Sequence, residues 1–187
     1  MQTLVYVSVA QADRRAFEHF CESSGYTNEV LVDRGFRLSL SQRQCVQLKL
    51  LFHQLQDDFG SQLVGVIGFE DDGIMRLAIE IAEYTASGQL LDLADCLWMS
   101  VEQKDLRLLE ALRSKLRSLN NDLIDTVSMY LSCSNNAVLA AEYLYLHRNT
   151  FNYRLDKFYD ETMIDVRDVQ LSRLLQLYFV MNERLKD

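Results

Sequence analysis

A change of character near residue 100 is the feature that most constrains how this chain folds. Before that point, short segments rich in β-branched residues alternate with segments of helical periodicity. From Glu102 onward the strand signals disappear and leucine becomes the dominant apolar residue. A chain of 187 residues has room for one large or two small domains. We therefore predict an α+β protein, in which an α/β domain over residues 1–100 is followed by a leucine-rich linker helix over 101–120 and an all-α domain over 121–187.

The first hundred residues predict a sheet covered by helices. Runs of β-branched and aromatic residues indicate strands at residues 3–9, 29–32, 36–40 and 63–69. Helical apolar spacing indicates helices at residues 13–24, 41–57 and 74–84. Gly25 and Gly60 stand after two of these helices and Ser41 stands before one, as expected of capping residues. The apolar segment from Leu90 to Trp98 fits either a strand or a helix.

Two of these segments predict more specific local features. The strands at 29–32 and 36–40 flank Asp33-Arg34-Gly35, which predicts a hairpin with glycine in its turn. The helix at 41–57 is expected to bury one stripe, formed by Cys45, Leu48, Leu51, Phe52 and Leu55.

The leucines after the boundary predict one continuous amphipathic helix. They recur at intervals of three and four residues, at Leu109, Leu112, Leu116, Leu119 and Leu123. Such a seam packs either on its own domain or on a second copy of the chain. Because it spans only about two heptads, its length leaves both alternatives open.

Catalytic and metal chemistry have little support in the sequence. The cysteines lie too far apart for a zinc site or a redox motif, and we expect reduced core thiols at Cys21, Cys45, Cys96 and Cys133. The acidic run Glu70-Asp71-Asp72-Gly73 lacks the rest of any cation-binding loop and is interpreted as a solvated turn. The sequence contains no phosphate loop, nucleophile elbow or dinucleotide fingerprint. We therefore expect no enzymatic activity, no cofactor and no metal.

The sequence also predicts a cytoplasmic location without membrane contact. No apolar run approaches the roughly 20 residues that a membrane-spanning helix needs. The first residues, Met1-Gln2-Thr3-Leu4-Val5, lack the basic region of a signal peptide.

Residues 136–158 have the pattern of a helix-turn-helix. Ala140 and Ala141 supply small side chains where a second helix crosses closely. The core between the two helices is expected to contain Leu144, Leu146, Phe151 and Leu155. The predicted turn falls at Tyr145-Leu146-His147, and the second helix opens with polar residues. In helix-turn-helix proteins this end of the second helix faces the base edges.

The chemistry of the second helix suits duplex DNA, although the chain carries a formal charge of −8. In the helix-turn-helix segment, Arg148, Arg154 and Lys157 outnumber Glu142 and Asp156, which makes the local face basic. Arg can pair with guanine and Asn with adenine, while a helix N-terminus attracts phosphate. We expect Arg148, Asn149 and Asn152 to read bases. The other predicted contacts, to bases or phosphates, are His147, Thr150, Arg154 and Lys157, together with Tyr153, whose alternative role is packing.

These residues resemble a known regulator family. The segment 147–155 closely resembles the His-Arg-Asn-Thr-Leu-x-Tyr-Arg-Leu signature in the C-terminal helix-turn-helix domain of PucR/CdaR-type transcriptional regulators. Upstream, residues 123–131 are similar to the Leu-x-x-Thr-Leu-x-x-Tyr-Leu helix of that family. Downstream, residues 164–168 and the leucines after them resemble its Leu-Asp-Leu-x-Asp segment and closing helix. The spacing from the alanine pair is also similar to that of Fis-type helix pairs.

Three positions depart from the family pattern. Tyr145 stands where many helix-turn-helix proteins have a turn glycine, so a positive φ there would cost roughly 1 kcal/mol. Met163 replaces a usual glycine, and Asn152 stands where a second arginine is common. The resemblance also implies that the α/β domain is a degenerate relative of the GGDEF fold. Because Asp33-Arg34-Gly35 replaces the Gly-Gly-Asp-Glu-Phe motif, cyclase activity is not carried over.

The expected function is therefore that of a cytoplasmic regulator of transcription. We expect a homodimer that places two helix-turn-helix units one DNA turn apart on double-stranded DNA, with a small-molecule effector of unknown identity. The alternative is a non-catalytic ligand-binding or protein-binding sensor module with vestigial DNA affinity, which salt dependence would distinguish. A nucleotide cyclase is a weaker third reading, and we expect no turnover of GTP with Mg²⁺.

Overall fold

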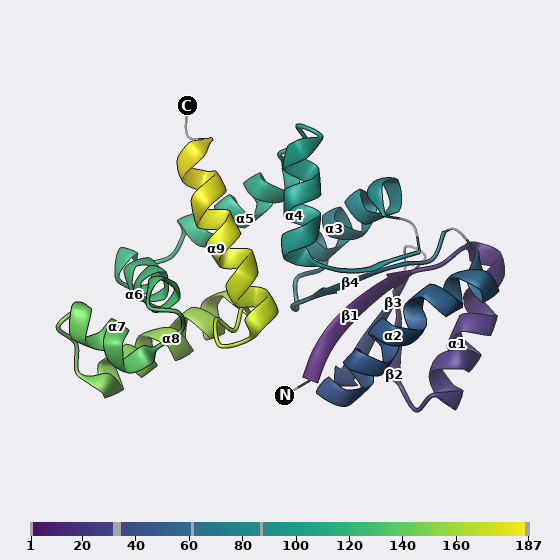
Figure 1. The fold of residues 1–187 in the computed structure, drawn as a ribbon, viewed down its shortest axis with the longest axis horizontal. Helices are drawn as coiled ribbons and strands as arrows, with labels where there is room; N and C mark the ends of the chain where they lie inside the picture. Colours follow the sequence, from purple (N-terminus) through teal and green to yellow (C-terminus); the bar gives the residue numbers. More distant parts are fainter. Residues whose placement is uncertain (1, 32–34, 61, 87, 186–187) are drawn as a thin grey trace. The chain divides into compact units, whose positions relative to one another are not determined.

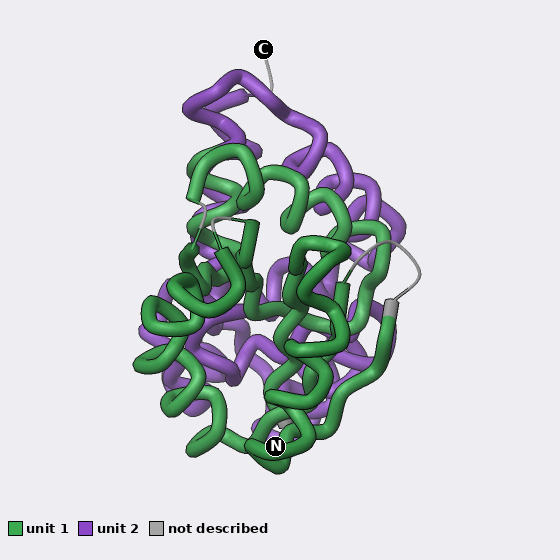
Figure 2. The backbone as a smooth tube through the Cα atoms, turned by 90° about the vertical axis from the view of Figure 1, so that its right-hand side faces the viewer, with its two compact units in different colours: residues 1–99 green, residues 100–187 purple. Residues whose placement is uncertain are grey.

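The computed structural model describes residues 2–31, 35–60, 62–86 and 88–185. The chain divides into two compact units, unit 1 over Met1–Met99 and unit 2 over Ser100–Asp187 (Figure 2). Unit 1 contains a five-stranded sheet, and the described elements of unit 2 are all helices (Figure 1). The predicted α+β class is therefore confirmed.

The sheet of unit 1 has the strand order β2-β3-β1-β4-β5. All neighbouring pairs are antiparallel except β4 and β5, which are parallel. The strands are β1 (Gln2–Ser8), β2 (Thr27–Leu31), β3 (Gly35–Ser41), β4 (Val64–Gly68) and β5 (Leu90–Asp92). The helices are α1 (Arg14–Ser23), preceded by the 3-10 turn η1 (Gln11–Asp13), α2 (Gln42–Phe59), α3 (Asp72–Thr85) and α4 (Leu93–Glu102).

Most of the predicted elements of unit 1 are present. The ambiguous segment from Leu90 to Trp98 is a short strand that leads directly into α4. Strands β2 and β3 pair with Leu31 opposite Gly35, as a hairpin requires, whereas Asp33 and Arg34 of the predicted turn lie outside the described residues. Ser41 caps α2 as predicted, because its hydroxyl accepts from the Gln44 amide while the Gln44 side chain accepts from the Ser41 amide.

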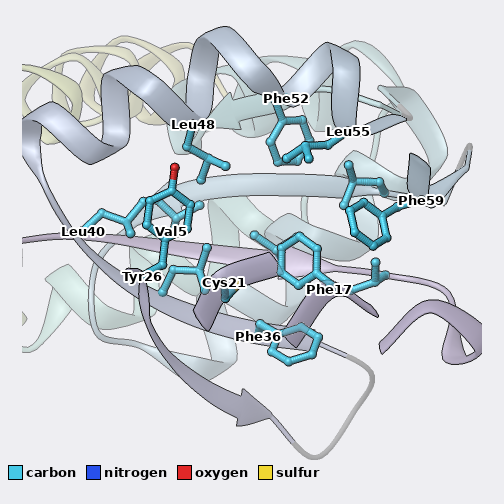
Figure 3. Close-up of a cluster of buried hydrophobic side chains, with 14 of the residues drawn as sticks. Val5, Phe17, Cys21, Tyr26, Phe36, Leu40, Leu48, Phe52, Leu55 and Phe59 are labelled. Atoms are coloured by element: carbon cyan, nitrogen blue, oxygen red, sulfur yellow. The ribbon is translucent and has the colours of Figure 1, made fainter. Parts of the chain in front are cut away.

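One face of the sheet packs against α1 and α2 to form a large apolar core (Figure 3). The rings of Phe17 and Phe36 lie 5.1 Å apart, and Phe59 meets Phe17 edge-on at 5.4 Å. The predicted stripe of α2 is wrong at Leu51, which is 39% exposed. The buried positions of α2 follow intervals of three and four residues, at Cys45, Leu48, Phe52, Leu55 and Phe59. Leu51 is rotated by about 100° from Phe52 and about 40° from Leu55, so it lies just outside the edge of this stripe.

The opposite face of the sheet is covered in part by α3. A Cβ on Gly65 would meet Phe52 of α2, whereas a Cβ on Gly68 would meet Met75 of α3 at 2.3 Å. Because residues 65 and 68 point to opposite faces of a strand, α2 and α3 lie on opposite faces of the sheet. The Met75 side chain of α3 therefore occupies the space that glycine leaves open at position 68 of β4. The carboxylate of Asp71, which was interpreted as part of a solvated turn, caps α3 by accepting from the Ile74 amide.

Unit 2 is built from α4's last residues and five further helices. These are α5 (Arg107–Arg117), α6 (Asn121–Ser132), α7 (Ala137–Tyr143), α8 (Arg148–Thr162) and α9 (Val169–Arg184). Helix α6 packs against α7, α8 and α9, and α5 packs against α9. The Arg113 Nε donates to the Asn182 Oδ1 at 2.8 Å and so links α5 to α9.

The prediction of one continuous leucine helix is wrong. Helix α5 ends at Arg117, and Asn120 starts α6 by accepting from the Asp122 amide at 2.9 Å. Asparagine favours this N-cap position because its side chain replaces a missing backbone partner. All five leucines of the predicted seam are buried. They therefore belong to the interior of the chain and leave no exposed seam for a second copy.

The described ranges contain no cluster of three or more His, Cys, Asp or Glu side chains suited to a metal. None of their helices has the length and apolarity to span a bilayer. The thiols of Cys21, Cys45 and Cys96 are buried, as predicted, whereas Cys133, also expected in the core, is only half-buried. Burial raises the pKa of the Cys21 thiol to about 12.

Candidate nucleic-acid interface

The first helix of the helix-turn-helix, α7, starts at a side-chain cap. The Asn136 Oδ1 accepts from the amides of Val138 and Leu139, at 3.1 Å each. Ala140 and Ala141 are buried at 0% and 4% exposure, in a helix that packs against both α6 and α8. The small residues therefore lie where the sequence pattern predicts close helix packing.

The turn between α7 and α8 contains a left-handed residue. Tyr145 has φ of 54°, and its amide donates to the Glu142 carbonyl at 3.0 Å. The turn does require a positive φ at this position, and it costs about 1–2 kcal/mol for a residue with a Cβ. The Tyr145 side chain is 97% exposed, so the cost is not offset by packing. Leu144 and Leu146, predicted in the core, are only half-buried.

His147 is the N-cap of α8. Its Nδ1 accepts from the Asn149 amide at 3.2 Å, which satisfies one of the amides left free at a helix start. The exposed imidazole therefore lies beside the helix N-terminus.

Helix α8 divides the predicted contact residues between two flanks. Its buried side is formed by Phe151, Leu155, Phe158 and Thr162. At 100° per residue, the predicted base readers Arg148, Asn149 and Asn152 fall in one sector of about 100°. The remaining predicted contacts Thr150, Arg154 and Lys157 fall in a sector of about 60° on the other side of the helix. Tyr153 lies between the two flanks and is 62% exposed, which argues against the packing alternative.

The cations of the second flank are compensated inside the protein. The Arg154 Nη2 lies 2.8 Å from the Asp122 Oδ2 of α6, and the Arg154 Nη1 lies 3.5 Å from the Thr126 Oγ1. The Lys157 Nζ lies 3.7 Å from the Glu161 carboxylate. Arg148, in contrast, is exposed and makes no ion pair within the described part of the chain. The uncompensated positive charge of α8 is therefore concentrated in its first turn.

A residue outside the predicted set also shapes this surface. Asp156 lies two turns beyond Asn149 on the base-reading flank, where a free carboxylate would repel phosphate. The Arg167 Nη2 donates to the Asp156 Oδ1 at 2.7 Å. Arg167 lies in the loop between α8 and α9, and sequence spacing alone gave no reason to pair it with Asp156.

Met163 ends α8 in the left-handed conformation. Its φ is 61°, and its amide donates to the Tyr159 carbonyl at 2.7 Å. A C-terminal position of this kind favours glycine, because glycine has no Cβ to clash with the following carbonyl. The left-handed backbone at position 163 therefore explains why the regulator family that this segment resembles usually has glycine here.

The negative charge of the chain is unevenly divided between the units. Residues 1–99 contain 14 acidic and 7 basic side chains, whereas residues 100–187 contain 13 acidic and 12 basic ones. The acidic excess therefore lies almost entirely in unit 1. Total charge consequently does not oppose contact between unit 2 and a polyanion.

Comparison with known families identifies the region that contains this surface. Residues 123–181 match the PucR C-terminal helix-turn-helix domain. This PucR-type domain spans α6 to α8 and most of α9. The family resemblance of the signature at residues 147–155 is thus confirmed for this region, while the GGDEF-like assignment of the α/β domain stays a prediction.

Individual relatives share the same region. The uncharacterized protein YxkF of Bacillus subtilis is 32% identical over 63 residues, which cover 34% of this chain and 21% of YxkF. The proline-responsive transcriptional activator PutR of Bacillus subtilis is 32% identical over 87 residues, which cover 46% of this chain and 20% of PutR. The chain spans about a fifth of the length of these two curated relatives.

A solved structure shares the fold over a longer range. The regulator of polyketide synthase expression from Bifidobacterium adolescentis aligns with all of this chain and with 81% of its own, at a TM-score of 0.50. The sequence identity is 17%, so this similarity describes the fold alone.

Proposed function

We propose that this protein is a cytoplasmic transcriptional regulator that binds specific sequences of duplex DNA through α7 and α8. The observation that carries the proposal is the first turn of α8, inside the PucR-type domain. There Arg148, Asn149 and Thr150 are exposed at a capped helix N-terminus, next to the imidazole of His147. This arrangement combines base-reading side chains with the positive end of a helix dipole.

The two flanks of α8 receive different roles in this proposal. Arg148, Asn149 and Asn152 read base edges in the major groove, and His147 and Thr150 contact bases or phosphates. Tyr153 and Lys157 lie at the rim of the contact and reach the backbone. Arg154 acts as a positioning residue, because its guanidinium holds α8 against Asp122 and Thr126 of α6.

The proposed regulator acts as a homodimer on an inverted repeat, with a small-molecule effector. The name of PutR, a proline-responsive transcriptional activator, supports a role in controlling gene expression. The dimer contact uses a surface other than the leucine seam, because those leucines are buried. Sedimentation of the full chain over a range of concentrations measures the oligomeric state directly.

The test is the selection of bound fragments from random duplex DNA by the full chain. Fluorescence anisotropy of the enriched sequence at several salt concentrations then gives the affinity and its salt slope. We expect an enriched inverted repeat and an affinity that falls as salt rises. Recovery of no motif, or binding that ignores salt, would refute the proposal in favour of a partner-binding sensor module.

A pair of matched variants locates the contact. Arg148→Ala is expected to cost about 1–3 kcal/mol of binding free energy and to relax specificity at one base pair. Arg117→Ala removes the same charge from the exposed end of α5 and should leave the selected motif unchanged. Equal effects of the two variants would show that α8 does not read the DNA.

A further inference from the structure

A groove in unit 1 lies apart from the helix-turn-helix and takes no part in the proposed DNA contact. Its volume is about 350 Å³, which falls in the range of about 300–1,000 Å³ seen for small-molecule sites. Strand β1 forms the floor of the groove and α3 forms its wall. Gly35, at the start of β3, closes one side. All of its lining residues belong to unit 1.

The pleat of β1 explains why polar groups face this groove. Val5, Val7 and Val9 point into the core with α1 and α2, so Tyr6 and Ser8 point to the opposite face. In the pairing of β1 with β4, Tyr6 and Ser8 lie opposite Val66 and Val64, on the face that α3 covers. The floor of the groove is therefore formed by Tyr6 and Ser8, while Val5 and Val7 of the same strand face the apolar core.

The hydroxyl groups of the floor are buried and already bonded. Ser8 is 7% exposed and donates to the Glu83 carboxylate at 2.5 Å. Tyr6 is 3% exposed and donates to the Phe69 carbonyl at 3.4 Å. The Ser8 contact holds the exposed Glu83 side chain at the groove, and a carboxylate can accept further hydrogen bonds from an incoming donor.

The wall formed by α3 combines apolar side chains with more acidic than basic ones. One stripe of this helix lines the groove, formed by Asp72, Met75, Arg76, Ile79, Glu80 and Glu83. Three carboxylates against one guanidinium give the lining a negative balance, and the twofold acidic excess of unit 1 acts in the same direction. A concave site with apolar walls focuses such a potential and attracts cations. Met75 and Ile79 supply the apolar surface between the charges.

We propose that this groove binds a small organic cation, an amine or guanidine on a short apolar chain. The ammonium or guanidinium group donates to the carboxylates of Glu80 and Glu83, as ionised donors and acceptors form the stronger hydrogen bonds. The methylene chain packs on Met75 and Ile79. A simple metal ion would gain nothing from this apolar wall, and an anion would be repelled by the acidic balance. The binding does not rest on DNA contact by unit 2, so the two proposals fail separately.

The experiment is isothermal titration calorimetry of the full chain with four small probes, in the absence of DNA. The cationic probes are 1,4-diaminobutane and agmatine. Butane-1,4-diol has a similar apolar chain without charge, and succinate is the anionic match. We expect saturable binding of the two cations and no binding of the diol or of succinate. Binding of succinate or of all four probes would overturn the proposal, as would binding of none.

Conservative variants then locate the site. Glu80→Gln and Glu83→Gln keep the size of the side chain and should each weaken the binding of 1,4-diaminobutane by about tenfold or more. Asp57→Asn removes the same charge from the exposed end of α2, outside the groove, and should leave the affinity unchanged. Melting curves without ligand check that each variant is folded. If Glu83→Gln is unstable, the affinity of Glu80→Gln alone tests whether the cation binds in this groove. Equal weakening by Asp57→Asn would show general attraction to an acidic surface and would refute the site.

Discussion

Substitution of Arg154 and of Arg148 should separate stability from DNA recognition within one helix. The Arg154 side chain is 23% exposed and pairs with Asp122, whose side chain is 60% exposed. A pair that is this accessible contributes about 0.2–1 kcal/mol, because solvent screens the charges. Arg154→Gln should therefore lower the free energy of unfolding by no more than about 1 kcal/mol. Arg148→Gln should leave it unchanged, since Arg148 is exposed and has no ion pair among the described residues.

The free energy of unfolding is measured by urea denaturation of Arg154→Gln and Arg148→Gln. The same measurement is made on Asp122→Asn and on the Asp122→Asn/Arg154→Gln double variant. The double-mutant cycle should give a coupling energy of about 0.5 kcal/mol between the two side chains. In DNA binding the larger effect should come from the other arginine. Arg148→Gln should relax sequence specificity, whereas Arg154→Gln should preserve the selected motif. If Arg154 instead contacts phosphate in the complex, Arg154→Gln will reduce the salt slope by about 1 per contact. That result would refute the positioning role.

Three further outcomes follow from backbone geometry and burial. Tyr145→Gly should stabilise the chain by up to about 1 kcal/mol in urea denaturation, because glycine adopts a φ of 54° without strain. Gly68→Ala should destabilise it by about 1–3 kcal/mol, because the added Cβ would meet Met75 at 2.3 Å. Burial raises the pKa of the Cys21 and Cys96 thiols. In native protein at pH 8, the half-buried Cys133 should therefore react with a thiol reagent well before Cys21 or Cys96 does.

The sequence predicts the helix-turn-helix more completely than the segment before it, and the reason is physical. Local signals determine α7 and α8, since the caps Asn136 and His147 and the alanine pair act within a few residues. The leucine spacing led to the wrong prediction of one continuous helix. The same spacing of three and four residues also fits two helices separated by a short break. Only the N-cap preference of Asn120 distinguishes them.

Long-range pairing is the second kind of feature that the sequence did not predict. Arg154 and Asp122 are 32 residues apart, and Arg167 and Asp156 are 11 residues apart across a helix end. Composition counts all of these as surface charges, yet the fold pairs some of them, while Arg148 makes no ion pair with the residues that the structure describes. The sequence separates base readers from other contacts but gives no sign that Arg154 and Lys157 are paired within the protein.

Release of Arg154 should increase the affinity of the protein for DNA. Asp122→Asn removes the carboxylate that pairs with Arg154 and leaves a free guanidinium on the flank of α8 that carries Thr150 and Lys157. We expect tighter binding to any duplex and a salt slope steeper by about 1 per protomer, since one more phosphate is neutralised. Asp125→Asn makes the same charge change at an exposed position of α6 and is the control. If both variants raise affinity equally, net charge and not the release of Arg154 is responsible. If only Asp122→Asn does so, the native ion pair limits non-specific attraction and leaves discrimination between sequences to the first turn of α8.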